Sequence, residues 1–343
     1  MGPPTIYYFC PDVRGVSGGV RVMYRHVDVL NRNNIPAAIL HSTNGFRCSW
    51  FSNKTRIAYV KSTEFKKEDV IVFPEVHLAY FTDSHNPGDL ELQIKRMVSK
   101  SRHKYYANML SKVNARKVIF NQNAYLTFEG IHYDLDYEIP YLREDVAGTL
   151  CVSDDTYQYL KHIFPELSLF KIRHSAESSC FYFQPQKKAQ IAFIADRNLT
   201  DLNQVLNILK IQKITEGLRL VAIKNKTEKE VAQILRDSAV FLSFGRAEGF
   251  SLPPMEAMLC GCVVVGYHGR GGREYFNPEF SYPVEAGDVI AFAKSAGEVI
   301  SAYKADPSSL LAKGKLASEQ ISIKYNARNE EADLIKAWSE ILT

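Results

Sequence analysis

Two glutamates frame the segment of the sequence with the strongest chemical signal. Glu248 and Glu256 lie within the run EGFSLPPMEAMLCGCVVV, and a second apolar run precedes it. This order predicts a strand, a glycine-bearing loop, a helix and another strand. Pro253 and Pro254 suit the first turn of the helix, where a missing N–H is harmless, and Gly261 suits its end.

The start of the predicted helix offers a site for a diphosphate. Its amide groups lack intrahelical partners, and the positive end of the helix dipole favours anions. These amides belong to the stretch Gly249, Phe250, Ser251 and Leu252. The two flanking carboxylates would repel phosphate but accept hydrogen bonds from hydroxyls. A diphosphate would suit the helix start, and neighbouring sugar and ribose hydroxyls would suit the two carboxylates. The segment therefore indicates binding of a nucleotide-diphosphate sugar.

The same segment resembles the E-x7-E signature of retaining glycosyltransferases with the GT-B fold, and it is most similar to glycosyltransferase family 4. The resemblance implies an α/β chain of two Rossmann-like, doubly wound parallel-sheet domains that face each other across a cleft. It implies that Glu256 holds the ribose hydroxyls and that Glu248 acts as a catalytic residue on the transferred sugar. It further implies sugar transfer with retention of configuration.

A glycine pair supports the resemblance. Gly18 and Gly19 follow the first apolar run and open a segment whose apolar residues recur at helical spacing. Glycine allows a backbone to approach a ligand closely, although the spacing is not that of the dinucleotide motif GxGxxG. The pair resembles the GGV loop of family 4 enzymes, so we expect it to line the donor site.

Basic residues after later strand-like runs supply the expected charge for the diphosphate. Arg197 resembles the basic residue that family members carry after the first strand of the second domain, and we assign it a catalytic role. The lysine that often follows it is absent here, and Lys224 or Arg246 could replace it. Arg270 and Arg273 lie in a glycine-rich stretch, which is either a loop whose arginine contacts phosphate or a flexible surface turn.

Polar residues that follow other strand-like runs are candidates for the acceptor side or the cleft. For each, the alternative is a loop residue satisfied by local partners. The candidates are Glu75, His77, Asn121, Gln122 and His174.

Short, continuous apolar runs alternate with helical patterns along the chain, as expected for parallel sheets buried on both faces. One series comprises Ile6–Cys10, Ala37–His41, Val70–Phe73, Val118–Asn121 and Thr149–Ser153, and the other comprises Gln190–Ala195, Leu218–Ile223, Val240–Phe244 and Cys262–Tyr267. We therefore predict an acceptor-side domain over residues 1–184 and a donor-binding domain over 185–325. The predicted amphipathic helix 326–343 should pack back on the first domain.

Composition narrows the possible partners. The 343 residues carry a net charge of +4, which is too weak by itself to indicate a nucleic-acid partner. No signal peptide or apolar run of transmembrane length is apparent, so we expect a cytoplasmic protein. The six cysteines lack zinc spacing, and the Asp134–Asp136 pair does not follow a strand-like run. We expect no metal or other cofactor besides the nucleotide-sugar co-substrate.

Three other interpretations stay open. A sugar-nucleotide 2-epimerase would share the fold without needing a saccharide or lipid-linked acceptor. A non-catalytic nucleotide-sugar-binding protein with a decayed site is another, because the lysine that often follows the position of Arg197 is missing. The basic stretch Lys95–Lys117 suggests a solvated helical face, a peripheral contact with an anionic membrane at its inner face, or RNA binding.

Overall fold

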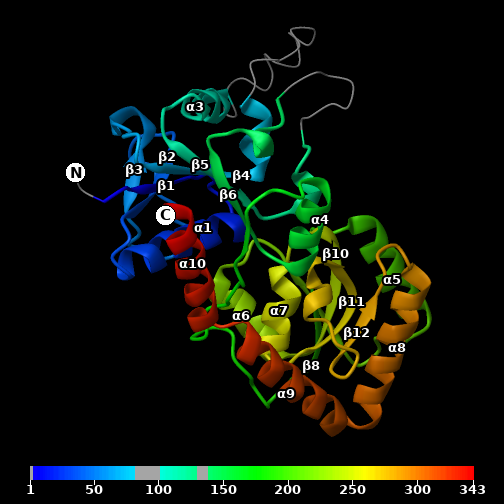
Figure 1. Cartoon of the computed structure of the whole chain (residues 1–343). Coiled ribbons are helices and arrows are strands. Elements are labelled where there is room, and N and C mark those ends of the chain that lie inside the picture. The colour runs from blue at the N-terminus through cyan, green and yellow to red at the C-terminus, as the bar shows by residue number, and fades with distance from the viewer. Residues whose placement is uncertain (1–2, 82–100, 130–137) are drawn as a thin grey trace. The chain divides into compact units, whose positions relative to one another are not determined.

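The computed structural model describes residues 3–81, 101–129 and 138–343, which form two compact units (Figure 1). The first unit consists of Met1–Val152, Thr156–Ile172 and Glu331–Thr343. The second consists of Ser153–Asp155 and Arg173–Glu330. Each unit contains one sheet whose paired strands all run parallel.

The sheet of the first unit has seven strands in the order β3-β2-β1-β4-β5-β6-β7. Its strands are β1 (Ile6–Phe9), β2 (Ala37–His41), β3 (Ile57–Tyr59), β4 (Val70–Pro74), β5 (Arg116–Asn121), β6 (Val146–Cys151) and β7 (Leu169–Lys171). Its helices are α1 (Gly18–Arg32), α3 (Ser101–Ser111) and α4 (Asp154–Ile163), with short 3-10 turns η1 (Val60–Ser62), η2 (Glu75–Tyr80), η3 (Ala124–Leu126) and η4 (Pro140–Leu142).

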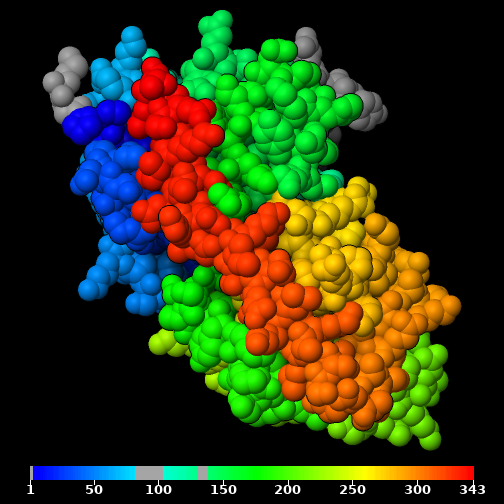
Figure 2. Space-filling model, turned by 60° about the horizontal axis from the view of Figure 1, so that its bottom comes forward, coloured from blue at the N-terminus to red at the C-terminus, as the bar shows by residue number. Residues whose placement is uncertain are grey.

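The C-terminal helix α10 (Ala327–Leu342) contributes its residues from Glu331 onward to the first unit. Trp338 is fully buried there, and its indole Nε1 donates to the Tyr8 hydroxyl at 3.3 Å. Arg32 pairs with Glu331 at 2.8 Å. In Figure 2 this red helix lies beside the blue N-terminal residues of the same unit. The end of the chain is therefore part of the first unit's core.

The sheet of the second unit has five strands in the order β12-β11-β10-β8-β9. They are β8 (Lys188–Ile194), β9 (Arg219–Ile223), β10 (Ser238–Glu248), β11 (Val263–Arg270) and β12 (Ser281–Val284). The helices are α5 (Leu199–Ile211), α6 (Glu228–Asp237), α7 (Leu252–Leu259), α8 (Val289–Ala305) and α9 (Pro307–Lys324), and η5 spans Gly271–Glu274. Helices α5 and α8 share one face of the sheet, while α6 and α7 cover the other (Figure 1).

The predicted α/β class with two parallel sheets is confirmed, and every predicted apolar run overlaps a strand. The edge strands β3, β7 and β12 lie outside the two predicted series. Strands β3 and β7 are three residues long and only half-buried, and β12 contains Pro283, so none of them shows a long apolar run.

The division between the units falls at Ile172, earlier than the boundary predicted at residue 184. The intervening segment contacts the second unit: the Gln184 amide donates to the Cys260 carbonyl at 3.4 Å, and His174 packs on Phe250. The segment that reads as a linker in the sequence is therefore held by side-chain and backbone contacts to one unit.

No helix in the described parts of the chain combines the length and apolar character needed to cross a membrane. Asp134 and Asp136 lie outside the described residues, and so does the beginning of the basic stretch, Lys95–Lys100.

Candidate functional site

The loop between β10 and α7 carries the glutamates singled out by the sequence. Strand β10 ends at Glu248 and α7 begins at Leu252, with both prolines in its first turn. Gly261 follows the helix with a φ of +83°, which explains why glycine stands there. The strand–loop–helix–strand order predicted from the sequence is confirmed.

The turn into α7 is fixed by the loop after β11. A Cβ atom at Gly271 would lie 1.9 Å from the Gly249 carbonyl oxygen, so only glycine allows this approach. The Tyr275 hydroxyl donates to the carbonyl of Ser251 at 2.5 Å and lies 3.1 Å from that of Phe250. Because the Tyr275 hydroxyl holds the carbonyls of Phe250 and Ser251, the turn keeps one backbone conformation at the helix start.

Three residues other than glycine have left-handed backbones at the ends of β8, β10 and β11. Ser251 has a φ of 65°, Arg270 of 68° and Asn198 of 44°. Side chains other than glycine disfavour this region, and such strain concentrates at functional sites. The strained positions mark the carboxyl edge of the sheet, where ligands bind in doubly wound folds.

Glu248 and Arg197 come together at this edge. Arg197 Nη1 lies 3.3 Å from Glu248 Oε1, and the Arg197 side chain is 55% exposed while that of Glu248 is 19% exposed. Glu248 ends β10 and Arg197 follows the neighbouring strand β8, as their predicted shared role requires. A phosphate entering the site could therefore meet a guanidinium that a carboxylate already orients.

Arg246 is held by a second carboxylate. Its Nη2 lies 3.3 Å from Asp201 Oδ2, and Asn198 Nδ2 donates to the same oxygen at 2.8 Å. Burial alone would raise the pKa of Asp201, but the hydrogen bond from Asn198 and the Arg246 charge lower it below its ordinary value. Asp201 thus stays ionised and keeps Arg246 beside the loop that follows β8.

The remaining donor-side candidates differ in placement. Glu256 is buried in α7, with 6% of its surface exposed. Lys224 follows the edge strand β9 and is exposed; within the described chain, no hydrogen bond or ion pair joins it to the other candidates. Arg273 pairs with Glu285 at 3.2 Å. Arg246 is therefore the better-placed second cation.

His174 belongs with the donor-side loop rather than with the first unit. It is buried, and its ring meets the Phe250 ring edge-on at a centroid distance of 4.9 Å. His174 therefore packs against the turn before α7, and its role at the acceptor side or the cleft stays a prediction.

In the first unit, three predicted residues form one group. Helix α1 begins at Gly18, and a Cβ at Gly19 would lie 2.9 Å from Gln122 Oε1. The backbone N–H of Gln122 donates to Glu75 Oε2 at 3.0 Å. Burial raises the pKa of Glu75 to about 7, although backbone hydrogen bonds oppose the shift. Gly19 thus makes room for the Gln122 side chain, while the buried Glu75 carboxylate holds the Gln122 backbone in place.

Asn121 and His77 turn into the interior instead. Asn121 is fully buried, and its Nδ2 donates to Tyr141 at 2.7 Å and to Thr127 at 2.9 Å. His77 packs at 4.4 Å from the His103 ring, and burial holds its pKa well below the ordinary value. These contacts place both side chains in the interior of the first unit, and their roles at the acceptor side or the cleft stay predictions.

Sequence reasoning missed a polar group that follows β1 and β2. Asp12 accepts from Ser42 Oγ at 2.7 Å and contacts His41 Nδ1 at 2.8 Å, and His41 Nε2 reaches the Tyr24 hydroxyl at 2.7 Å. Burial opposes ionisation of Asp12, but these partners lower its pKa to about 2. The position of Asp12 after a predicted strand was the only available signal.

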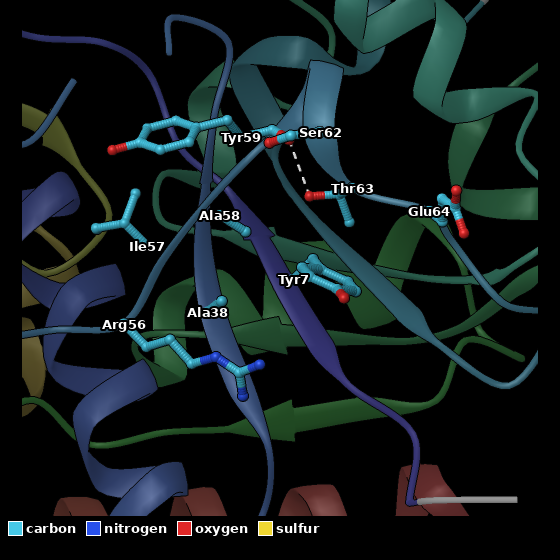
Figure 3. Close-up of a pocket in the computed structure, with 9 residues that line it drawn as sticks. All are labelled: Tyr7, Ala38, Arg56, Ile57, Ala58, Tyr59, Ser62, Thr63 and Glu64. Atoms are coloured by element: carbon cyan, nitrogen blue, oxygen red, sulfur yellow. Dashed lines mark hydrogen bonds between the residues drawn. The ribbon is translucent and has the colours of Figure 1, made fainter. Parts of the chain in front are cut away.

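A pocket of about 360 Å³ opens elsewhere in the first unit, against β1, β2 and β3 (Figure 3). Its lining comprises Tyr7, Ala38, Arg56, Ile57, Ala58, Tyr59, Ser62, Thr63 and Glu64. None of the predicted site residues lines it. Because the site residues gather at the carboxyl edges of the sheets, we place the chemistry there and not in this pocket.

Comparison with known proteins agrees with this geometry. Residues 209–308 match the family Glycosyl transferases group 1, a range that includes Glu248 and Glu256. An alpha-1,6-glucosyltransferase of Actinobacillus pleuropneumoniae serotype 7 is 24% identical over 274 residues, which are 76% of this chain and 72% of the relative.

Solved structures show the same fold. HepE from Anabaena in complex with UDP has a TM-score of 0.64 at 11% identity and covers 98% of this chain and 99% of its own. TarM from S. aureus, solved with UDP, fondaparinux and alpha-GlcNAc-glycerol, has a TM-score of 0.53 at 15% identity. That match covers 83% of this chain and 57% of the TarM chain.

The fold is that of the GT-B glycosyltransferases, and the sequence matches indicate a glycosyltransferase. The match to the family Glycosyl transferases group 1 covers residues 209–308, which lie in the second unit.

The buried Glu75 makes a prediction for stability. Its pKa in the folded protein, about 7, lies above the ordinary 4.5, so the folded state holds the proton more tightly. The stabilisation is complete below pH 4.5 and is lost as the pH rises through 7. Relative to the wild type, Glu75→Gln should gain about 3 kcal/mol in free energy of unfolding between pH 4.5 and pH 8.

Urea denaturation across this pH range measures the difference. The exposed Glu68→Gln variant is the matched control, and we expect no such trend for it. A Glu75→Gln difference that stays constant with pH would show that the carboxyl ionises normally in the folded protein.

Proposed function

We propose that the chain transfers a sugar from a uridine-diphosphate sugar to a saccharide or lipid-linked acceptor. The observation that carries the proposal is the convergence of Glu248, Arg197 and the start of α7 at one sheet edge. Uridine is favoured because HepE and TarM were solved with UDP, and glucose because of the alpha-1,6-glucosyltransferase relative.

In the proposed donor complex, the amides from Gly249 to Leu252 and the Arg197 guanidinium bind the diphosphate. Both would stabilise the negative charge that builds on the leaving diphosphate as the glycosidic C–O bond breaks. Arg246, oriented by Asp201, supplies a second positive charge. The buried Glu256 would accept hydrogen bonds from the ribose hydroxyls.

We assign Glu248 to the transferred sugar, whose transition state should be oxocarbenium-like. The carboxylate would accept a hydrogen bond from a sugar hydroxyl while Arg197 stays paired with it. The leaving phosphate would take the proton of the acceptor hydroxyl, so the reaction balances without a separate base. We propose that the new bond keeps the configuration of the donor, which the anomeric coupling constant of the product tests.

The first unit is assigned to the acceptor. A connected group at its sheet edge comprises Gly19, Gln122 and Glu75. Gln122 is half-buried, so its side-chain amide can meet a ligand. A cytoplasmic location is part of the proposal; it agrees with six free cysteines, which a reducing compartment preserves.

Substitution of the two glutamates tests the donor site. Glu248→Gln should lower kcat about 100-fold, because it removes a charge aimed at the transition state. Glu256→Gln should weaken UDP binding about tenfold, because it weakens charge-assisted hydrogen bonds to the ribose. Initial rates of sugar transfer and UDP titration by calorimetry measure these effects.

The exposed Glu298→Gln variant on α8 is the matched control and should behave as the wild type. Full activity in both Glu248→Gln and Glu256→Gln would refute the site. UDP binding without transfer would favour a binding protein, and a C2-epimerised nucleotide sugar formed without acceptor would identify an epimerase.

The proposed charge stabilisation by amides and arginines requires no divalent ion. We therefore expect the transfer rate in excess EDTA to equal the rate with added Mg²⁺ or Mn²⁺. A rate that falls in EDTA and returns on adding either ion would contradict the proposal. A calcium-loaded chelator serves as the control for chelator effects unrelated to metal removal.

A further inference from the structure

A second pocket in the first unit lies among the loops that follow β1 and β2. It has a volume of about 330 Å³ and contains none of the residues assigned above. Its lining comprises Val13, Arg14, Gly45, Phe46, Arg47 and Ser49. The arginines come from different loops, so the pocket presents two guanidinium groups from different parts of the chain.

In the part of the chain that the structure describes, no carboxylate forms an ion pair with either arginine of this pocket, although Arg47 and Asp28 attract each other electrostatically. Among the described residues, Arg14 forms no hydrogen bond or ion pair, and Arg47 donates to the neutral Asn53 amide at 2.6 Å. Asp12 is occupied by His41 and Ser42, and Asp28 accepts from Thr55 at 2.8 Å. Both guanidinium groups remain exposed and available to an anion.

The two loops are held together before any ligand binds. Trp50 Nε1 donates to the Val13 carbonyl at 3.3 Å, and Asn53 Nδ2 donates to the Cys48 carbonyl at 2.9 Å. Phe46 packs edge-on against His41 with a centroid distance of 4.8 Å. A pocket that is ordered in advance loses less conformational entropy on binding, which favours a specific site over a mobile basic surface.

We propose that this pocket binds an anionic group, a phosphate or a carboxylate, on the saccharide acceptor. Guanidinium groups match the planar geometry of carboxylates and the oxygens of phosphates with paired hydrogen bonds. The pocket follows β1 and β2, at the same sheet edge as Gly19, Gln122 and Glu75. The inference rests on the proposed function, and it narrows the acceptor to acidic saccharides.

Fluorescence of Trp50 provides the readout, because its indole bonds to Val13 of the pocket. The second tryptophan, Trp338, is fully buried. Fluorescence is titrated with inorganic phosphate, glucose 6-phosphate, glucuronate and, as a neutral control, glucose. Titrations are run with and without saturating UDP, which would displace anions from the donor site. We expect a saturable response to glucose 6-phosphate or glucuronate, unchanged by UDP, and none to glucose.

Arg14→Gln and Arg47→Gln should each raise the dissociation constant of the acidic sugar about tenfold or more. The matched control is Arg56→Gln, at an exposed arginine of the other pocket of the same unit. This variant should leave the dissociation constant of the acidic sugar unchanged. In transfer assays with an acidic acceptor, the pocket variants should raise KM for the acceptor and leave UDP affinity as in the wild type.

Three results of these titrations would overturn the inference. They are no saturable response to either acidic sugar, equal affinity in the variants, or inorganic phosphate binding as tightly as glucose 6-phosphate, which would indicate a site for the free ion. Vesicles of phosphatidylserine that bind through these arginines, with no response to soluble sugars, would assign the pocket to membranes and also overturn it. Failure of UDP binding would refute the donor site instead, while the anion titrations would still report on this pocket.

Discussion

The backbone contact between Gly249 and Gly271 is the constraint on which the candidate donor site depends. It joins the loop after β10 to the loop after β11 with no side chain between them. The Tyr275 hydroxyl stabilises the same turn by donating a hydrogen bond to the Ser251 carbonyl. The left-handed backbones of Ser251 and Arg270 are tolerated because these contacts determine the path of the chain. The helix start, whose first amides have no partners within the helix, is therefore held in one conformation that can receive an anion.

Charge is arranged around that helix start in pairs. Arg197 with Glu248 and Arg246 with Asp201 each place a guanidinium at the edge while a carboxylate sets its direction. The pairs are partly exposed and contribute little to stability by themselves. Their effect is positional: an incoming diphosphate would meet oriented donors, and little reorganisation would be needed as charge develops in the reaction.

The sequence predicts the second unit better than the first for a physical reason. Arg197 follows β8, while Arg246 and Glu248 stand at the end of β10, so their neighbourhood follows from the order of strands that are buried on both faces. In the first unit, Asn121 ends β5 and turns inward, while the adjacent Gln122 faces Gly19. Strand ends can be placed from apolar runs, but side-chain direction at the end cannot, and the link between Asp12 and His41 exists only after folding.

The most direct test of the account is a crystal structure of the complex with UDP. The account predicts the diphosphate at the amides from Gly249 to Leu252, with Arg197 in contact and the ribose hydroxyls on Glu256. A diphosphate bound away from the start of α7, or a ribose that does not reach Glu256, would contradict the account.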